Sequence, residues 1–297
     1  MIPFNKYYNQ FNILSISLVV ISLFFLVFKG LNFGIDFKGG TLIELRSTDS
    51  KINVSSLRDN LNQMNLGDVS VKNFGNQTDF LIKFENSNNK NVIEEIKSNL
   101  DKSFGNNFNF RRVENVGPKV SAELLRSGVI AITVALILML IYIWIRFEWQ
   151  FSLGAILALF HDVIVTLGLF SLLGLEINLS IIAAVLTIVG YSMNDTVVIY
   201  DRIRENLSKY SKMTIDEVSN LSINETLSRT IITSSTTLLA LFSIFILGGE
   251  ILKGFSFAMI LGVIIGTYSS IFVASPMLKY LKVSSKTMEK DEEKIVP

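Results

Sequence analysis

The chain alternates between long apolar runs and shorter polar segments. A helix that crosses a bilayer needs about 20 apolar residues, and the runs that approach or exceed this length are Phe11–Phe28, Gly128–Ile145, Phe151–Leu173, Leu179–Tyr200, Thr230–Leu247 and Phe255–Leu278. We predict six membrane-spanning helices from these runs. The first run is too long for the apolar core of a typical signal peptide, and no small-residue cleavage site precedes Lys29-Gly30. It is therefore predicted to be an uncleaved signal anchor.

The segment between the first two runs has a different texture, with short elements typical of a folded domain. Alternating or β-rich stretches predict strands, and spacings of three and four predict helices. The predicted strands are Thr41–Arg46, Val69–Phe74, Phe80–Phe84 and Phe108–Val116, and the predicted helices are Val54–Met64 and Val92–Leu100. A Gly-Asn-Gln-Thr-Asp turn is expected between the second and third strands. The order βαββαβ predicts a ferredoxin-like α+β sandwich, so the fold class is a polytopic α-helical membrane protein carrying a small α+β domain.

The distribution of Lys and Arg predicts the orientation and the domain organisation. Ten Lys or Arg residues lie on the side of Arg146, Arg202 and the tail, against Lys253 alone in the short loops of the other side. The positive-inside rule therefore places both termini in the cytoplasm and exports the α+β domain. The expected parts are 1–30 (N-terminus and first span), 31–126 (periplasmic domain), 127–280 (five spans, with a cytoplasmic segment 201–228) and 281–297 (a charged, disordered tail). Helix starts are predicted at Thr214 and at Asn224.

Composition narrows the chemistry. The chain is 49% hydrophobic and 18% charged, whereas soluble domains carry roughly 25% charged residues, so a membrane protein is expected. A net charge of +1 argues against a nucleic-acid binder. The absence of cysteine excludes thiol chemistry, and the single histidine, His161, excludes a His-rich metal site. No nucleotide motif or nucleophile–base set is visible, so we expect neither a cofactor nor enzymatic activity.

Asp195 is the most informative residue. It lies near the end of an apolar run, where a carboxylate is costly unless it is protonated, paired or hydrated, and such residues are functional candidates by default. Thr187, Tyr191 and Asn194 recur with it at intervals of three and four, which predicts a polar stripe on the helix. The structural alternative is a carboxylate that serves helix packing.

Arg229 opens the next apolar run, at a depth similar to that of Asp195, and Thr233 follows it one turn later. Beside Asp195 a permanent positive charge would favour the carboxylate, while desolvation would favour the neutral acid. Such opposing effects suit an ion-coupled switch. The alternative for Arg229 is that its side chain extends to the membrane surface.

Two further sets of residues are candidates. His161 and Asp162 form an ionisable pair within the third run, and they are either a proton relay or a structural pair. Ala258, Gly262, Gly266 and Ser270 repeat every four residues in the last run. Stripes of small residues allow close helix packing in lipid and carry no information about substrate.

Several motifs together carry a resemblance. They are FGIDFKGGT at 33–41, VGPKV at 116–120, FHD at 160–162, VGYSMNDTVVIYDR at 189–202 and NETLSRTIIT at 224–233. In this order the chain resembles the SecF family, the smaller subunits of bacterial SecD–SecF protein-export complexes, which are related to the resistance–nodulation–division (RND) transporters. The resemblance covers nearly the whole chain except the tail and the variable middle of the α+β domain.

The resemblance implies a function and partners. Proteins of this kind work with SecD beside the SecYEG channel, with YajC as a further partner, and use the proton or sodium motive force to draw exported preproteins out on the periplasmic side. It also implies that Asp195 and Arg229 belong to the ion pathway, with further carboxylates supplied by SecD. Two alternatives remain open: an RND-type efflux half-transporter for small molecules, and a passive scaffold for the translocon.

Overall fold

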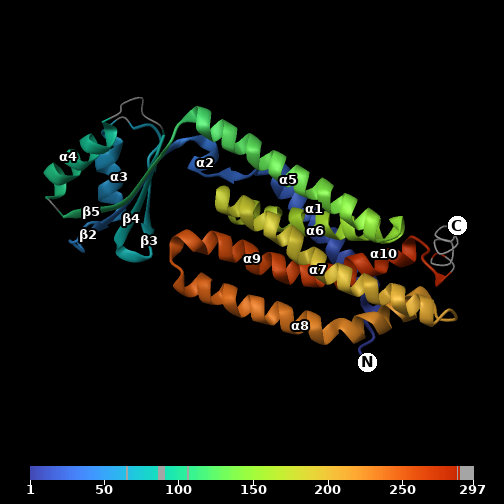
Figure 1. Ribbon diagram of the computed structural model, residues 1–297. Helices are drawn as coiled ribbons and strands as arrows, with labels where there is room; N and C mark the ends of the chain where they lie inside the picture. Colours follow the sequence, from blue (N-terminus) through green and yellow to red (C-terminus); the bar gives the residue numbers. More distant parts are fainter. Residues whose placement is uncertain (65, 86–90, 106, 286, 288–297) are drawn as a thin grey trace. The chain divides into compact units, whose positions relative to one another are not determined.

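A computed structural model describes residues 1–64, 66–85, 91–105, 107–285 and 287 (Figure 1). The chain divides into two compact units. The first, the helical bundle, comprises Met1–Asn32, Ala131–Glu176 and the residues from Ser180 onward. The second comprises Phe33–Ile130 and Ile177–Leu179, and its folded part between Gly40 and Val116 is called the α+β domain below.

Long apolar helices dominate the first unit. Within the described residues, six helical segments are long and apolar enough to cross a membrane. They are η1 with α1 (Phe4–Tyr7 and Tyr8–Phe28), α5 (Pro118–Arg146), α6 (Trp149–Leu173), α7 (Leu179–Lys209), α8 (Ile215–Leu247), and the last segment, made of α9 (Glu250–Ser269), the π-helical turn η2 (Ser270–Ala274) and α10 (Ser275–Tyr280). The six predicted spans are confirmed.

The polar segment between the fourth and fifth spans is mostly helical, because α7 and α8 extend beyond their apolar runs. α8 begins after Thr214, whose side chain accepts a hydrogen bond from the Glu217 backbone in a capping box. The predicted start at Thr214 is thus confirmed. The predicted start at Asn224 is wrong, because this residue lies within α8. Its amide instead donates to the carbonyls of Ile2 and Asn220.

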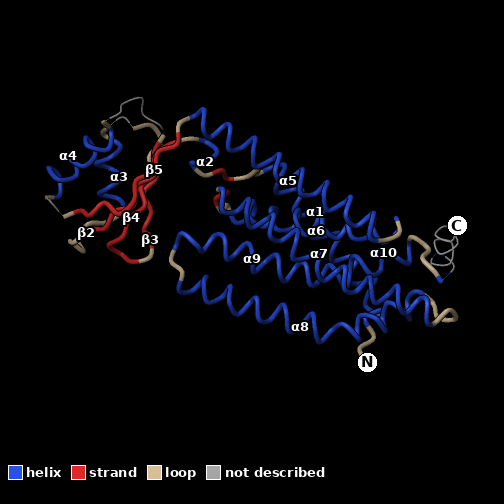
Figure 2. Tube along the Cα trace, viewed as in Figure 1, coloured by secondary structure: helices blue, strands red, loops and turns tan. Residues whose placement is uncertain are grey.

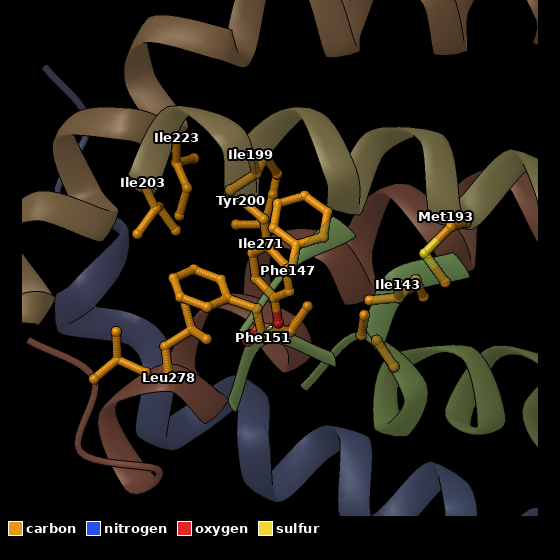
Figure 3. Close-up of a cluster of buried hydrophobic side chains, with 14 of the residues drawn as sticks. Ile143, Phe147, Phe151, Met193, Ile199, Tyr200, Ile203, Ile223, Ile271 and Leu278 are labelled. Atoms are coloured by element: carbon orange, nitrogen blue, oxygen red, sulfur yellow. Dashed lines mark hydrogen bonds between the residues drawn. The ribbon is translucent and has the colours of Figure 1, made fainter. Parts of the chain in front are cut away.

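Burial within the bundle is uneven. Half of the apolar stretch in α6 and in α7 is buried inside the chain, against 11% in the first span and 17% in α8. One apolar cluster gathers where α5, α6, α7 and the last span meet, around Phe147, Phe151 and Tyr200 (Figure 3). The Tyr200 hydroxyl donates to the Ala274 carbonyl at 2.9 Å. Gly154 permits this packing, since a Cβ there would lie 2.4 Å from the Tyr200 oxygen.

The α+β domain has the predicted element order. It contains β2 (Gly40–Ser47), α3 (Val54–Asn62), β3 (Ser70–Phe74), β4 (Asn76–Phe84), α4 (Val92–Phe104) and β5 (Phe108–Val116) (Figure 2). Its sheet is antiparallel, with strand order β3-β4-β2-β5. This arrangement is that of a ferredoxin-like sandwich and confirms the fold class.

Alternation along β2 explains the domain core. Ile43 and Leu45 are fully buried and belong to one apolar cluster with Leu57 of α3 and Ile96 of α4. The turn between β3 and β4 is tighter than predicted. Only Gly75, at φ 80°, separates the strands, and a glycine accepts this left-handed conformation at low cost.

Two glycines, Gly39 and Gly40, lie in the chain between the first span and this domain, and the backbone packs closely around them. Before them lie β1 (Asn32–Phe33), which pairs with β6 (Glu176–Ile177), and the short helix α2 (Ile35–Lys38). Gly40 has φ 133°, and a Cβ there would lie 2.7 Å from the Phe84 carbonyl oxygen. Gly39 also has a positive φ. A side chain at Gly40 would therefore disrupt the start of β2.

The predicted disorder of the tail 281–297 falls mostly on residues 286 and 288–297, which lie outside the described residues.

Candidate functional site

Four consecutive hydroxyl residues of α9 and its end, Thr267-Tyr268-Ser269-Ser270, lie at the centre of the bundle's polar contacts; we call them the hydroxyl segment. Successive residues of a helix point about 100° apart, so four in a row face different neighbours. Thr267 bonds to Ser234 of α8 at 2.8 Å and Tyr268 to Ser15 of α1 at 2.7 Å. Ser269 bonds to α6 and Ser270 to α7. The hydroxyl segment therefore joins four other helices.

Asp195 lies inside the bundle. Its side chain is buried, with 4% of the residue exposed. One carboxylate oxygen accepts a hydrogen bond from Thr267 Oγ1 at 3.4 Å, which is long for a bond from a hydroxyl. Through Thr267, Asp195 is connected to Ser234 on α8. The carboxylate thus has a weak hydroxyl partner and is not held by a strong one.

The predicted partner of Asp195 lies nearby without pairing with it. Arg229 is close enough for an electrostatic interaction with Asp195. Its side chain is exposed on α8, and within the described residues no ion pair or hydrogen bond joins the two. The structure therefore brings the two charges to neighbouring helices and leaves a direct bond unmade.

The other residues of the predicted polar stripe lie in different environments. Thr187 and Asn194 are exposed, and Tyr191 is half-buried. Thr187 donates to the Ala183 carbonyl of its own helix, and Thr233 on α8 donates to the carbonyl of Arg229. Asp195 therefore turns toward the interior while Asn194, its neighbour in the chain, faces outward.

His161 and Asp162 lie deep in the bundle, and Asp162 is the more enclosed. Only 1% of Asp162 is exposed. One oxygen of its carboxylate is 2.9 Å from His161 Nδ1. The other accepts from Ser192 of α7 at 2.5 Å and from Ser269 of α9 at 2.7 Å. Asp162 thus joins α6, α7 and α9 through one carboxylate.

The small residues of α9 bring it against α7. A Cβ on Gly262 would lie 2.2 Å from an Ile188 side-chain atom, and one on Gly266 would lie 2.9 Å from Ser192 Cβ. Ala258 is fully buried, and Ser270 bonds to Thr196 at 2.8 Å. This close approach is what lets short serine and threonine side chains reach across to the carboxylates.

Sequence reasoning missed the hydroxyl residues that contact the two carboxylates, Ser192, Thr267 and Ser269, and also Ser234, which bonds to Thr267. Ser and Thr are frequent in membrane helices, and they usually bond to the carbonyl one turn earlier. Many here do so, including Thr236 and Ser256. The one available signal was the run of four hydroxyl residues, which a single sequence gives no reason to select.

Two family descriptions match segments of the chain. The family description "Protein export membrane protein SecD/SecF, C-terminal" matches residues 96–284, and "SecD/SecF GG Motif" matches residues 24–51. The second match contains Gly39 and Gly40, the glycines whose backbone contacts were described above.

Curated relatives cover most of the chain. A protein translocase subunit SecF of Rickettsia bellii is 50% identical over 267 residues, covering 89% of this chain and 88% of the relative. The SecF subunit of Rickettsia felis is 47% identical over 282 residues, covering 93% of this chain and 91% of the relative.

Solved structures agree with the fold. The crystal structure of SecDF, a translocon-associated membrane protein from Thermus thermophilus, superposes with a TM-score of 0.85 at 37% identity. It covers 95% of this chain, which spans 38% of the SecDF chain. SecDF in a super-membrane-facing form gives a TM-score of 0.71 at 36% identity, over 98% of this chain and 40% of that one. The chain therefore belongs to the SecD/SecF family, in its SecF branch of protein translocase subunits.

Proposed function

We propose that the chain couples an ion gradient to protein export, with Asp195 as the residue that takes up and releases the coupling ion. The observation that carries this proposal is the environment of Asp195. It is a buried carboxylate on a membrane-spanning helix, with one long hydrogen bond and a cation nearby that does not pair with it. Burial penalises the ionised form, and Arg229 supports it. A small displacement of α8 relative to α7 changes this balance and so changes the occupancy of Asp195.

A second observation supports a role in export together with a SecD-type subunit. Asn194 and Arg229 are exposed on α7 and α8, and within the described residues neither side chain has a hydrogen-bond or ion-pair partner. Exposed to lipid, an arginine and an amide are costly. A partner subunit that covers this face with polar groups removes the cost and completes the ion pathway. The solved relatives are SecDF proteins, which fits such a partner.

The orientation proposed for the chain places both termini in the cytoplasm. The backbone near the N-terminus bonds to the first turns of α8, with Ile2 N donating to Asn224 at 2.7 Å. Near the other end of the chain, Lys279 pairs with Asp216 at 2.5 Å. Residues near both ends of the bundle sequence therefore contact the first turns of α8. These turns follow a segment with Arg202, Arg204, Lys209 and Lys212, which the positive-inside rule assigns to the cytoplasm.

Asp195→Asn tests the proposal, because it keeps the shape of the side chain and removes the ionisable group. We expect gradient-stimulated export in proteoliposomes to fall at least tenfold while complex yield is unchanged. The matched control is Asp201→Asn, the same change six residues along α7, where the carboxylate pairs with Arg146 at 2.7 Å on the surface. Export by this control variant should stay close to wild type.

Four results, two from these variants and two from changing the sodium concentration or the pH, have different meanings. Wild-type export by Asp195→Asn would exclude ion coupling at this residue. Loss of assembly in Asp195→Asn and in Arg229→Met would favour the passive scaffold. Export that depends on sodium at fixed pH would identify sodium, and export that depends on pH at fixed sodium would identify the proton as the coupling ion.

A further inference from the structure

We propose that His161 and Asp162 form a second proton-holding site in the bundle, at which one proton is taken up on Nε2 of His161. Only its use in export rests on the proposed function; the protonation itself is independent of Asp195. Three features of the pair support this site: the hydrogen bonds around Asp162, the second ring nitrogen of His161 and the net charge of the two side chains.

The partners of Asp162 fix the direction of its hydrogen bonds. An ionised carboxylate only accepts, so Ser192 and Ser269 donate to one oxygen and His161 Nδ1 donates to the other. A neutral imidazole with its proton on Nδ1 has a bare lone pair on Nε2. The tautomer of His161 is thus set by the neighbouring carboxylate.

The second nitrogen of the ring has no partner. His161 is 5% exposed, and Nε2 is a buried atom with no hydrogen-bond partner in the described part of the chain. Buried polar atoms in native proteins are usually satisfied, and an exception calls for an explanation. Structural pairing alone would explain the Nδ1 bond, but it leaves Nε2 without a role. A proton-accepting position gives it one.

Charge explains why a proton binds there. With His161 neutral, the pair carries a net charge of about −1 in an apolar helix bundle, which is unfavourable. A proton that arrives from water binds the Nε2 lone pair, no other bond breaks, and the net charge of the pair becomes zero. Ser192 and Ser269 continue to hold the carboxylate in place. Release reverses the same step.

Within the described residues, His161 is the one basic side chain that pairs with Asp162. From α9, the Tyr268 ring lies 6.1 Å from the His161 ring, and its hydroxyl donates to the Phe11 carbonyl of α1. From α7, the nearest carboxylate along the helix is Asp195, three residues after Ser192. Arg229 on α8 interacts with Asp195, and α1 contributes Tyr8 as its ionisable side chain.

The hydroxyl segment makes this second site relevant to coupling. Thr267 contacts Asp195, and Ser269 contacts Asp162, two residues farther along the same helix. The π-helical turn η2 begins at the next residue, and such turns are irregular places where helices change packing. A change of charge at Asp195 or at the His161–Asp162 pair therefore acts on carboxylates that are held by one short stretch of α9.

His161 is the single histidine of the chain, so its protonation can be measured directly. The full chain, labelled with nitrogen-15 histidine, is reconstituted in lipid with an unlabelled SecD-type subunit. Ring nitrogen signals are then recorded by NMR between about pH 9 and about pH 5. We expect Nδ1 to carry a proton throughout, and Nε2 to change from a bare nitrogen to an N–H as the pH falls. A Nε2 that stays bare, or that carries a proton at every pH, would overturn the proposal.

Two variants make the result specific. Asp162→Asn removes the negative charge that balances the imidazolium, so the N–H signal at Nε2 should be lost over the same pH range. Asp201→Asn, on the surface end of α7, should leave the signal unchanged. A persistent Nε2 N–H signal in Asp162→Asn would contradict the paired site. Asp195→Asn should lower gradient-stimulated export at least tenfold while the histidine signal still changes with pH. The two proposals can therefore fail separately.

Discussion

Asp79 in the α+β domain and Asp195 in the bundle are equally buried, with 4% of each residue exposed, yet their partners differ. Asp79 receives two hydrogen bonds from the guanidinium of Arg46, at 2.5 and 2.6 Å, and Arg111 lies 3.8 Å away. Asp195 receives one bond of 3.4 Å from a hydroxyl. A carboxylate held by arginine stays ionised and acts in stability, whereas one held weakly by a hydroxyl can change its charge.

The difference between the partners of Asp79 and Asp195 has a local cause in each region. Arg46 and Asp79 face each other across the ladder between β2 and β4, so the sheet register itself makes the pair. In the bundle, the glycines of α9 bring its backbone close to α7, so a short hydroxyl side chain such as Thr267 reaches Asp195. The arginine that could neutralise Asp195 lies on an exposed face of α8. Within the described residues, Asp195 therefore has Arg229 nearby but no ion pair.

The largest effect is expected when Asp195 receives a basic partner, as Asp79 has in Arg46. Thr267→Lys places an ammonium beside the carboxylate, and we expect gradient-stimulated export to fall about a hundredfold, an effect of roughly 2.7 kcal/mol. Thr267→Met, similar in length and uncharged, is the control and should be less impaired. Export and complex yield are measured together in proteoliposomes. Equal export by the Lys and Met variants would show that a basic partner does not impair Asp195, and would contradict the contrast drawn between Asp195 and Asp79.

Neutralising Asp79 should change stability rather than export per folded molecule. Hydrogen bonding to Arg46, with support from Arg111, holds the pKa of Asp79 below its ordinary value. The ionised carboxylate therefore stabilises the domain at neutral pH, and this contribution is lost as the pH falls below the usual Asp range and through the lowered folded-state pKa. Asp79→Asn should destabilise the domain and remove that acid-dependent part.

Amide hydrogen exchange in β2 and β4 measures this effect in the full chain. Faster exchange is expected in Asp79→Asn at neutral pH, and the difference from wild type should shrink toward acid pH. Asp49→Asn is a useful control, because Asp49 lies in the loop after β2 and is not paired with arginine in the described part of the chain. A loss of gradient-dependent export without a change in exchange would contradict the structural role of Asp79.

The smallest expected effect comes from removing the weak bond itself. Thr267→Val deletes the hydroxyl that contacts Asp195 and Ser234 and keeps the side-chain shape. A hydrogen bond of this kind contributes about 1 kcal/mol, so we expect a loss of about three- to tenfold in gradient-stimulated export. Thr267→Ser restores the hydroxyl and should recover most of it. No recovery by serine would show that the threonine methyl group matters instead.

Much of the fold follows from local patterns in the sequence. Each span is a continuous apolar run, and the α+β domain shows strand alternation and helical spacing, so both are readable without any tertiary information. The main errors concern ends and turns. Asn224 resembles a helix start but lies inside α8, because its side chain bonds to the chain near the N-terminus, 222 residues away. The turn after β3 is shortened by a single glycine with positive φ.

The candidate site was only partly readable. Asp195, Arg229, His161 and Asp162 stand out because ionisable groups are rare in apolar helices. Which of these side chains contact one another could not be predicted from the sequence, because contacts between helices depend on the interhelical distance. Arg229 lies near Asp195 but, among the described residues, forms no ion pair with it, whereas serine and threonine residues that a single sequence gives little reason to select contact both carboxylates.

By itself, therefore, the sequence determined the six spans, the α+β domain, the family and the presence of costly charges in the membrane, since each of these depends on residue types along a local stretch. The tertiary structure alone decided what each charge contacts. Asp162 is enclosed by three donors, Asp195 has one long bond, and the Thr267–Ser270 segment serves both. These contacts depend on how closely α6, α7 and α9 approach one another. Small residues such as Gly262 and Gly266 allow the close approach, but only the packed helices show where it occurs.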